Sequence, residues 1–131
     1  MIGIDTNVLV RLITKDDARQ ASKAQKALQE KCSESEPGYI NSVVLAEVAW
    51  VLARTYQYSR DEIAIAIEGL LQVREFEIQN TEEAWHALQF FRQSNIGFAD
   101  LYLCVINKAQ GCECTLTFDK KAAKFDGFMA V

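Results

Sequence analysis

Short apolar segments alternate with longer helix-like segments along this chain, and this alternation limits the folds that are open to it. The strand-like segments are residues 1–4, 39–40, 75–78, 115–118 and 128–131. Strands separated by helices predict a mostly parallel sheet with helices on both faces. We therefore expect the α/β class, as a three-layer α/β/α sandwich around a mostly parallel central sheet.

The intervening segments carry helical periodicity or capping signals. Asp16 and Asp17 open a helix that reaches Cys32. Asn41 or Ser42 caps an almost entirely apolar helix, which we expect to be buried on most sides. The predicted helices are residues 6–13, 16–32, 43–56, 59–71 (with a capping box at its start), 81 onward, 98–109 and 119–124.

Nothing in the sequence divides the chain into several domains. It has 131 residues, 50% of them hydrophobic, with a single proline and no repeat, so we expect one domain over residues 1–131. No apolar run approaches the roughly 18–20 residues that span a membrane, and Asp5 comes too early for a signal peptide. We expect a cytoplasmic protein. The four cysteines lack zinc-site spacing and are expected to be free, buried thiols.

Four acidic residues lie inside or beside apolar segments: Asp5, Glu47, Asp100 and Asp119. A carboxylate removed from water needs a cation, hydrogen-bond donors or a raised pKa. Asp5 and Asp119 directly follow strands, whose carboxyl ends share one edge of a parallel sheet. Glu47 and Asp100 lie near the starts of helices that should begin at the same edge. The pattern therefore predicts a cluster of four carboxylates.

Each acid also has a simpler interpretation. Asp5 and Asp119 are good helix N-caps, and Asp100 in a first helical turn is favoured by the helix dipole. Glu47 could lie in a solvated notch, although its nearest helical cation, Arg54, is two turns away and too far for an ion pair. These interpretations explain the acids singly, whereas the cluster explains all four.

The sequence excludes several alternative chemistries. His86 is the only histidine, so a mechanism with two histidines is impossible, and we expect His86 at the surface or its boundary. There is no G-x-S-x-G nucleophile motif, no G-x-x-x-x-G-K phosphate loop and no G-x-G-x-x-G dinucleotide motif. Carboxylate clusters instead suit Mg²⁺ or Mn²⁺, which can activate water for phosphodiester hydrolysis.

The net charge of −4 argues against a general nucleic-acid-binding protein. A local basic rim near the two strand ends could still position phosphates, and a solvated charged surface is an equally good explanation. The candidate rim residues are Arg11, Lys15, Lys120, Lys121 and Lys124.

Four short motifs, in order along the chain, resemble the PIN domain in its VapC-type toxin form. They are Ile-Asp-Thr-Asn-Val-Leu at 4–9, Val-Leu-Ala-Glu-Val at 44–48, Phe-Ala-Asp-Leu-Tyr at 98–102 and Leu-Thr-Phe-Asp-Lys-Lys at 116–121. The resemblance covers essentially the whole chain. It implies a Mg²⁺- or Mn²⁺-dependent endoribonuclease that is the toxin of a type II toxin–antitoxin system.

The resemblance also assigns roles to residues and implies partners. The matching acidic positions, implied as catalytic metal ligands, are Asp5, Glu47, Asp100 and Asp119, with Asp5 and Asp100 the most secure pair. Asn7 and Thr117 match polar positions that hold the cluster in place. The implied partners are an RNA substrate, a cognate antitoxin protein and a second copy of the chain in a homodimer.

Two other functions remain open at this stage. A PIN-like module without activity could serve as a binding or regulatory partner, although all four family acids are present. A metal-dependent phosphatase of the haloacid dehalogenase type also begins with an Asp at a strand end, but it needs a second Asp where this chain has Asn7.

Overall fold

A computed structural model describes all 131 residues and shows helices alternating with parallel strands. The helices are α1 (Thr6–Thr14), α2 (Ala18–Lys31), α3 (Ser42–Arg54), α4 (Arg60–Gln72), α5 (Thr81–Gln93), α6 (Phe98–Ala109) and the 3₁₀ turn η1 (Ala122–Lys124). The strands are β1 (Ile2–Gly3), β2 (Gly38–Ile40), β3 (Phe76–Ile78), β4 (Thr115–Thr117) and β5 (Phe128–Ala130). The chain forms two compact units, Met1–Thr81 and Glu82–Val131, each described by itself.

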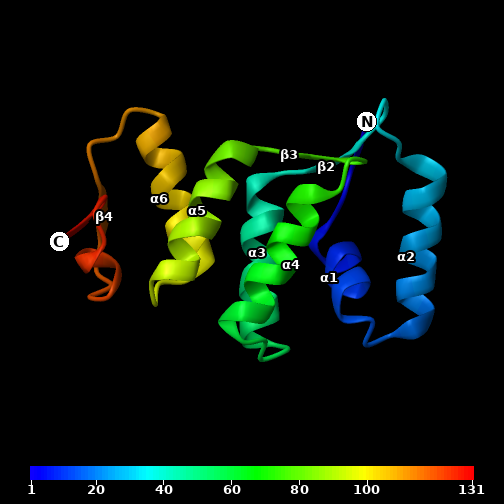
Figure 1. The fold of residues 1–131 in the computed structure, drawn as a ribbon, viewed down its shortest axis with the longest axis horizontal. Coiled ribbons are helices and arrows are strands. Elements are labelled where there is room, and N and C mark those ends of the chain that lie inside the picture. The colour runs from blue at the N-terminus through cyan, green and yellow to red at the C-terminus, as the bar shows by residue number, and fades with distance from the viewer. The chain divides into compact units, whose positions relative to one another are not determined.

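The first unit contains a parallel sheet in the order β1-β2-β3. Its register pairs Gly3 with Tyr39 and Tyr39 with Glu77. Figure 1 shows α1 between α2 and α3, with α4 beside α3, and these neighbouring helices are in contact. Because α1 directly follows β1 and α3 directly follows β2, both helices begin at the carboxyl edge of this sheet.

Apolar side chains from the sheet and helices form the core of the first unit. The fully buried residues include Leu9, Ile40, Leu45, Leu52 and Ile67. These side chains come from α1, β2, α3 and α4, so the core joins all the layers of this unit. Burying each such side chain contributes about 1.5–3 kcal/mol through the hydrophobic effect.

The prediction that the apolar helix is buried on most sides is wrong for one stripe of α3. Val43 and Trp50 are 67% and 54% exposed, and Glu47 between them is also exposed. Residues spaced by four and three positions lie on one face of a helix. That face is turned away from the core of the first unit, which the opposite face of α3 fills.

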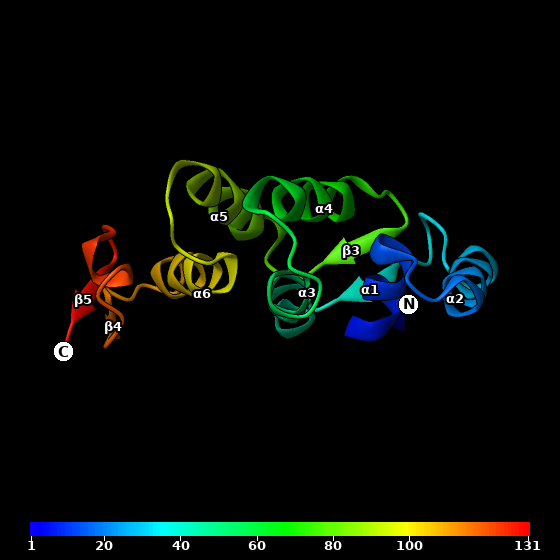
Figure 2. The ribbon, with the colours of Figure 1, turned by 90° about the horizontal axis from the view of Figure 1, so that it is seen from below.

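The second unit is held together by aromatic contacts and a two-stranded parallel sheet. Phe91 of α5 meets Phe98 of α6 edge to face, with ring centroids 6.2 Å apart. The strands β4 and β5 lie side by side (Figure 2). Gly127, which precedes β5, has φ of 117°. A Cβ atom there would lie 2.8 Å from the sulfur of Cys104, so this close approach requires glycine.

Most elements confirm the prediction from the sequence, including α6 and the capping box at Ser59. Asn41, not Ser42, caps α3. The strands form two parallel sheets of three and two strands, where one central sheet was expected. Only a 3₁₀ turn forms within 119–124. All cysteines are free as expected, but only Cys104 is buried. None of the helices is long and apolar enough to cross a bilayer.

A polar network joins the end of α1 to the loops after α1 and α3. The Arg11 guanidinium donates to Gln20, to the Tyr56 hydroxyl at 2.9 Å and to Asp16 at 3.3 Å. The Tyr56 hydroxyl in turn donates to Asp16 at 2.7 Å, and Thr14 donates to the same carboxylate. The hydrogen bond from Tyr56 is the main reason why the pKa of Asp16 lies below its ordinary value of 3.8.

We predict that Tyr56→Phe lowers the free energy of unfolding at neutral pH, because Asp16 loses its strongest donor. A depressed carboxyl pKa stabilises the fold above pH 3.8, and this contribution disappears as the pH falls through the folded-state pKa. Urea denaturation at several pH values should therefore show the difference from wild type shrinking in acid. Tyr58→Phe is the control, since the Tyr58 hydroxyl makes no hydrogen bond; an equal effect of both variants contradicts the prediction.

Candidate metal centre

Asp5 joins β1 to α1 and occupies the N-cap position. Its Oδ1 accepts a hydrogen bond from the adjacent Thr6 N–H at 2.8 Å. The side chains of the caps Asp17, Asn41 and Ser59 instead each reach the N–H three residues further on, as in usual capping. The Oδ2 of Asp5 has no partner, and the residue is exposed. Capping therefore uses only part of this carboxylate, and one oxygen is available to a ligand.

Glu47 lies in the second turn of α3, exposed and without a hydrogen bond or ion pair. Arg54 forms no ion pair with it, and its guanidinium lies 5.3 Å from the centre of the Trp50 ring. The helices that carry Asp5 and Glu47 pack against each other and begin at the same sheet edge. The first unit thus presents two unpaired carboxylates on neighbouring helices.

Asp100 lies in the first turn of α6, after the N-cap Gly97, which has no side chain to satisfy the free N–H groups of the helix. The carboxylate is partly buried and makes no hydrogen bond. Burial raises the pKa of Asp100 above its ordinary value, and the negative charge of Asp119 raises it further. The second unit therefore brings Asp100 and Asp119 close enough for their charges to interact.

Asp119 is held by the backbone between β4 and η1. Its Oδ1 accepts from the N–H groups of Lys121 at 2.8 Å and Ala122 at 3.1 Å. Its own N–H donates to Thr117 Oγ1 at 3.0 Å. These bonds fix the turn and leave the Oδ2 of Asp119 without a partner. Asp119 is a turn cap, as the simpler interpretation expects, with one oxygen remaining.

The chemistry of these donors fits a divalent cation of the Mg²⁺ type. All are carboxylate oxygens, the hard ligands that Mg²⁺ and Mn²⁺ prefer. The repulsion between Asp100 and Asp119 is unfavourable unless a cation or proton compensates it. Within either unit taken alone, no three Asp, Glu, His or Cys side chains lie close enough together to form a complete metal site. One unit by itself supplies two of the candidate ligands.

Two members of the predicted basic rim are not beside Asp5. Arg11 lies in the last turn of α1 and Lys15 at its C-cap, about 9 Å and 15 Å along the helix axis from the N-cap Asp5. Arg11 is also engaged with Asp16. Arg11 and Lys15 therefore do not support a basic rim beside Asp5, and the alternative of a solvated charged surface fits them better. Lys120, Lys121 and Lys124 are exposed, close to Asp119 in sequence and free of ion pairs, so they remain candidates for phosphate contacts.

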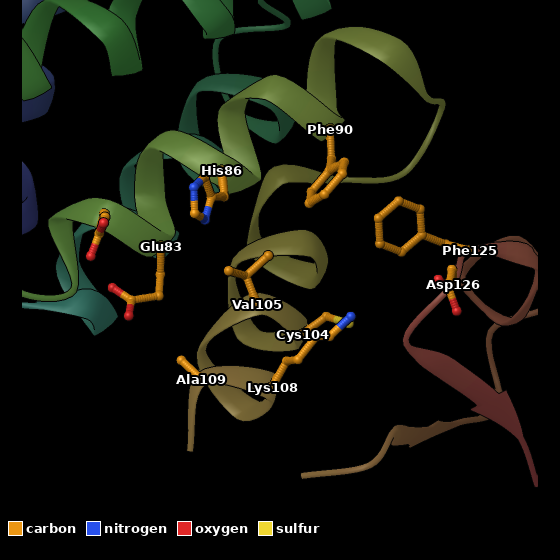
Figure 3. Close-up of a pocket in the computed structure, with 10 residues that line it drawn as sticks. Glu83, His86, Phe90, Cys104, Val105, Lys108, Ala109, Phe125 and Asp126 are labelled. Atoms are coloured by element: carbon orange, nitrogen blue, oxygen red, sulfur yellow. The ribbon is translucent and has the colours of Figure 1, made fainter. Parts of the chain in front are cut away.

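A pocket of the second unit contains none of the predicted acids. It has a volume of about 500 Å³ and is lined by α5, α6 and the segment before β5 (Figure 3). Phe90 and Phe125 meet edge to face at 5.1 Å, and Val105 adds to an apolar lining. His86 faces this pocket from α5 and is exposed, as expected for a surface residue. Its lining includes the acids Glu83 and Asp126 but neither Asp100 nor Asp119.

The fold and these residues define an α/β protein with carboxylates suited to a divalent cation. A family model for the PIN domain matches residues 2–127, and the chain therefore belongs to the PIN-domain family. No curated protein matches the sequence. PIN domains are typically metal-dependent nucleases that bind RNA, so family membership indicates nuclease activity in general.

The structure places Asn41 at the carboxyl edge of the first sheet, whereas the sequence indicates this residue only as a helix cap. Asn41 lies two residues beyond Tyr39, and Asp5 lies two residues beyond Gly3, the partner of Tyr39 in the parallel register. Asn41 is therefore the neighbour of Asp5 along the sheet edge. No sequence signal reveals this, because the pairing register depends on contacts between distant segments.

We predict that Asp100→Asn stabilises the metal-free protein, because it removes a partly buried charge that Asp119 repels. The gain in unfolding free energy should be less than about 1 kcal/mol, since solvent screens much of the repulsion. It should vanish as the pH falls through the raised pKa of Asp100, where the wild type takes up the proton. Thermal denaturation in EDTA measures the effect.

The matched control for that measurement is Glu113→Gln. Glu113 is an exposed acid of the same unit with no interaction partner. Its replacement should change the unfolding free energy by no more than about 0.5 kcal/mol. A destabilised Asp100→Asn variant, beside a neutral Glu113→Gln variant, would show that the Asp100 charge is not repelled in the folded protein.

Proposed function

We propose that this PIN-domain protein is a Mg²⁺- or Mn²⁺-dependent endoribonuclease and the toxin component of a type II toxin–antitoxin system of the VapC type. The observation that supports it best is the pair Asp100 and Asp119: the Asp100 carboxylate is partly buried, makes no hydrogen bond, and lies close enough to Asp119 for that charge to add to the rise in the pKa of Asp100 that burial causes. Such an arrangement is costly for the empty protein and useful for binding a cation.

Under this proposal residues 1–131 act as one domain in which Asp5, Glu47, Asp100 and Asp119 together bind metal and carry catalysis. Asp5 and Asp119 each offer the oxygen that their backbone contacts leave free. Glu47 and Asp100 offer side chains that make no other hydrogen bond. A divalent ion held by these carboxylates would supply an activated water and would stabilise negative charge on the phosphate.

Two polar residues position these ligands. The Oγ1 of Thr117 accepts from the Asp119 N–H and so fixes the turn that presents the Asp119 carboxylate. Asn7 lies in the first turn of α1, two residues after Asp5, and is exposed. We propose that both act through the acids, as residues that orient metal ligands commonly do.

We further propose a cytoplasmic homodimer that is neutralised by a cognate antitoxin protein. The first unit supports an interface because α4 exposes a large apolar side chain, Ile65, which is 67% exposed. Exposed apolar groups of this kind are enriched where proteins associate. Light scattering on the purified protein, alone and with a candidate antitoxin, measures both associations.

We predict that each of the variants Asp5→Asn, Glu47→Gln, Asp100→Asn and Asp119→Asn lowers Mn²⁺-dependent cleavage of a mixed RNA pool by at least about a hundredfold. Losing a ligand should cost at least as much as losing a group that orients one, which costs about 10–100-fold. The assay compares Mg²⁺, Mn²⁺ and EDTA, and calorimetry measures Mn²⁺ binding in the same preparations.

The control for that assay is Asp17→Asn, which removes one acidic charge at the N-cap of α2 and keeps a capping side chain. It should cleave like the wild type. A wild type that binds Mn²⁺ but cleaves no RNA would support a narrow substrate range or retained antitoxin. A wild type that binds no metal and cleaves nothing would favour the inactive binding module.

We predict that Thr117→Val weakens Mn²⁺ binding by about 10–100-fold, whereas Thr117→Ser keeps the affinity. Valine has the shape of threonine but cannot accept the hydrogen bond from the Asp119 N–H. Calorimetric titration with Mn²⁺ measures the affinity. Equal weakening in both variants would mean that side-chain packing, and not the hydroxyl, holds this turn.

A further inference from the structure

The parallel register of the first sheet places three polar residues in one row at its carboxyl edge. The register pairs three residues across β1, β2 and β3, namely Gly3, Tyr39 and Glu77. Two residues after each of them, in the same order, come Asp5, Asn41 and Gln79. The pairing continues beyond the strands, since Ile4 N–H donates to the Tyr39 carbonyl and Gln79 N–H to the Ile40 carbonyl, both at 2.9 Å. Adjacent strands are about 4.8 Å apart, so the backbone of Asn41 lies about one such spacing from Asp5.

The rest of this edge is polar, uncharged and ordered by its own hydrogen bonds. Gln79 Oε1 accepts from the Ser42 N–H at 3.0 Å, and Asn80 Nδ2 donates to Ser42 Oγ at 2.8 Å. Asn80 holds this position with φ of 54°, a left-handed conformation that asparagine tolerates better than most residues. Asp5 is thus the only charged residue in the row.

The amide of Asn41 is oriented by its capping bond. Its Oδ1 accepts from the Val44 N–H at 2.9 Å, and because that partner is a donor, the assignment of oxygen and nitrogen is fixed. The Nδ2 group therefore faces away from the helix with two N–H donors that have no partner. Asn41 is exposed, so these donors are accessible to a ligand.

We propose that Asn41 is an RNA-binding residue whose amide donates to a phosphate oxygen of the strand that lies across the metal centre. This inference rests on the proposed ribonuclease function. Asparagine side chains commonly contact nucleic-acid phosphates, and they position a strand without selecting its sequence. A neutral donor also serves here because a basic side chain next to Asp5 would compete with the metal for the carboxylate.

The test uses Asn41→Ser, which keeps an N-cap oxygen for α3 but removes the amide donors. Fluorescence anisotropy with labelled single-stranded RNA of mixed sequence should show Kd at least about tenfold higher, as for a lost hydrogen bond to a charged group. KM for cleavage should rise with kcat nearly unchanged, and Mn²⁺ affinity should stay that of the wild type. Asn41→Asp also keeps the cap and should weaken RNA binding further through its added charge.

The matched control is Ser59→Asp, which adds one negative charge at the N-cap of α4. Ser59 follows the far end of α3, whose 13 residues extend about 20 Å from Asn41. RNA affinity should be unaffected by this variant. If Asn41→Ser binds RNA as tightly as the wild type, the inference is overturned. The proposed function still stands in that case, provided that the wild type shows metal-dependent cleavage. A wild type that binds neither Mn²⁺ nor RNA overturns both.

Discussion

The hydrogen bonds that run from β1 through β2 to β3 decide where the polar residues of the first unit lie. Each strand has only two or three residues, so a shift of one residue would turn every side chain of the edge to the other face. The present register holds the start of α1 beside the start of α3. It makes Asp5 and Asn41 neighbours and keeps Glu47 on a helix that packs against α1. The proposed metal and RNA contacts of this unit depend on that register.

The second unit contributes a partly buried carboxylate, Asp100, whose charge interacts with that of Asp119. Burial, and to a lesser degree the charge of Asp119, disfavours the ionised form of Asp100 and raises its pKa. Backbone hydrogen bonds from Lys121 and Ala122 nevertheless keep Asp119 in place. Stability lost in this way is typical of functional sites, where the ligand restores it. Capping, which explains Asp5 and Asp119 in part, leaves one oxygen of each carboxylate free. A structural role and a ligand role are therefore compatible in the same side chain.

An acidic protein that binds RNA needs local hydrogen-bond donors or positive charges at the place where the phosphates bind. The chain has a net charge of −4. Arg11 forms an ion pair with Asp16 near the carboxyl end of α1, away from the sheet edge, so it does not contact a phosphate there. Uncharged donors such as the Asn41 amide can bind phosphate beside a metal without displacing it. Lysines close to Asp119 in sequence would add the electrostatic part of the affinity.

Local signals in the sequence are sufficient to place most helices and strands. The capping box at Ser59, the helical spacing of α5 and the apolar segment of α6 are properties of short segments, and the motifs around the four acids are local as well. Tertiary structure alone decides which face of α3 is exposed, which atoms of Asp5 and Asp119 are already used, and that Arg11 is occupied. It alone decides that Asn41 stands next to Asp5, because strand register and burial arise from packing between segments that are distant in the chain.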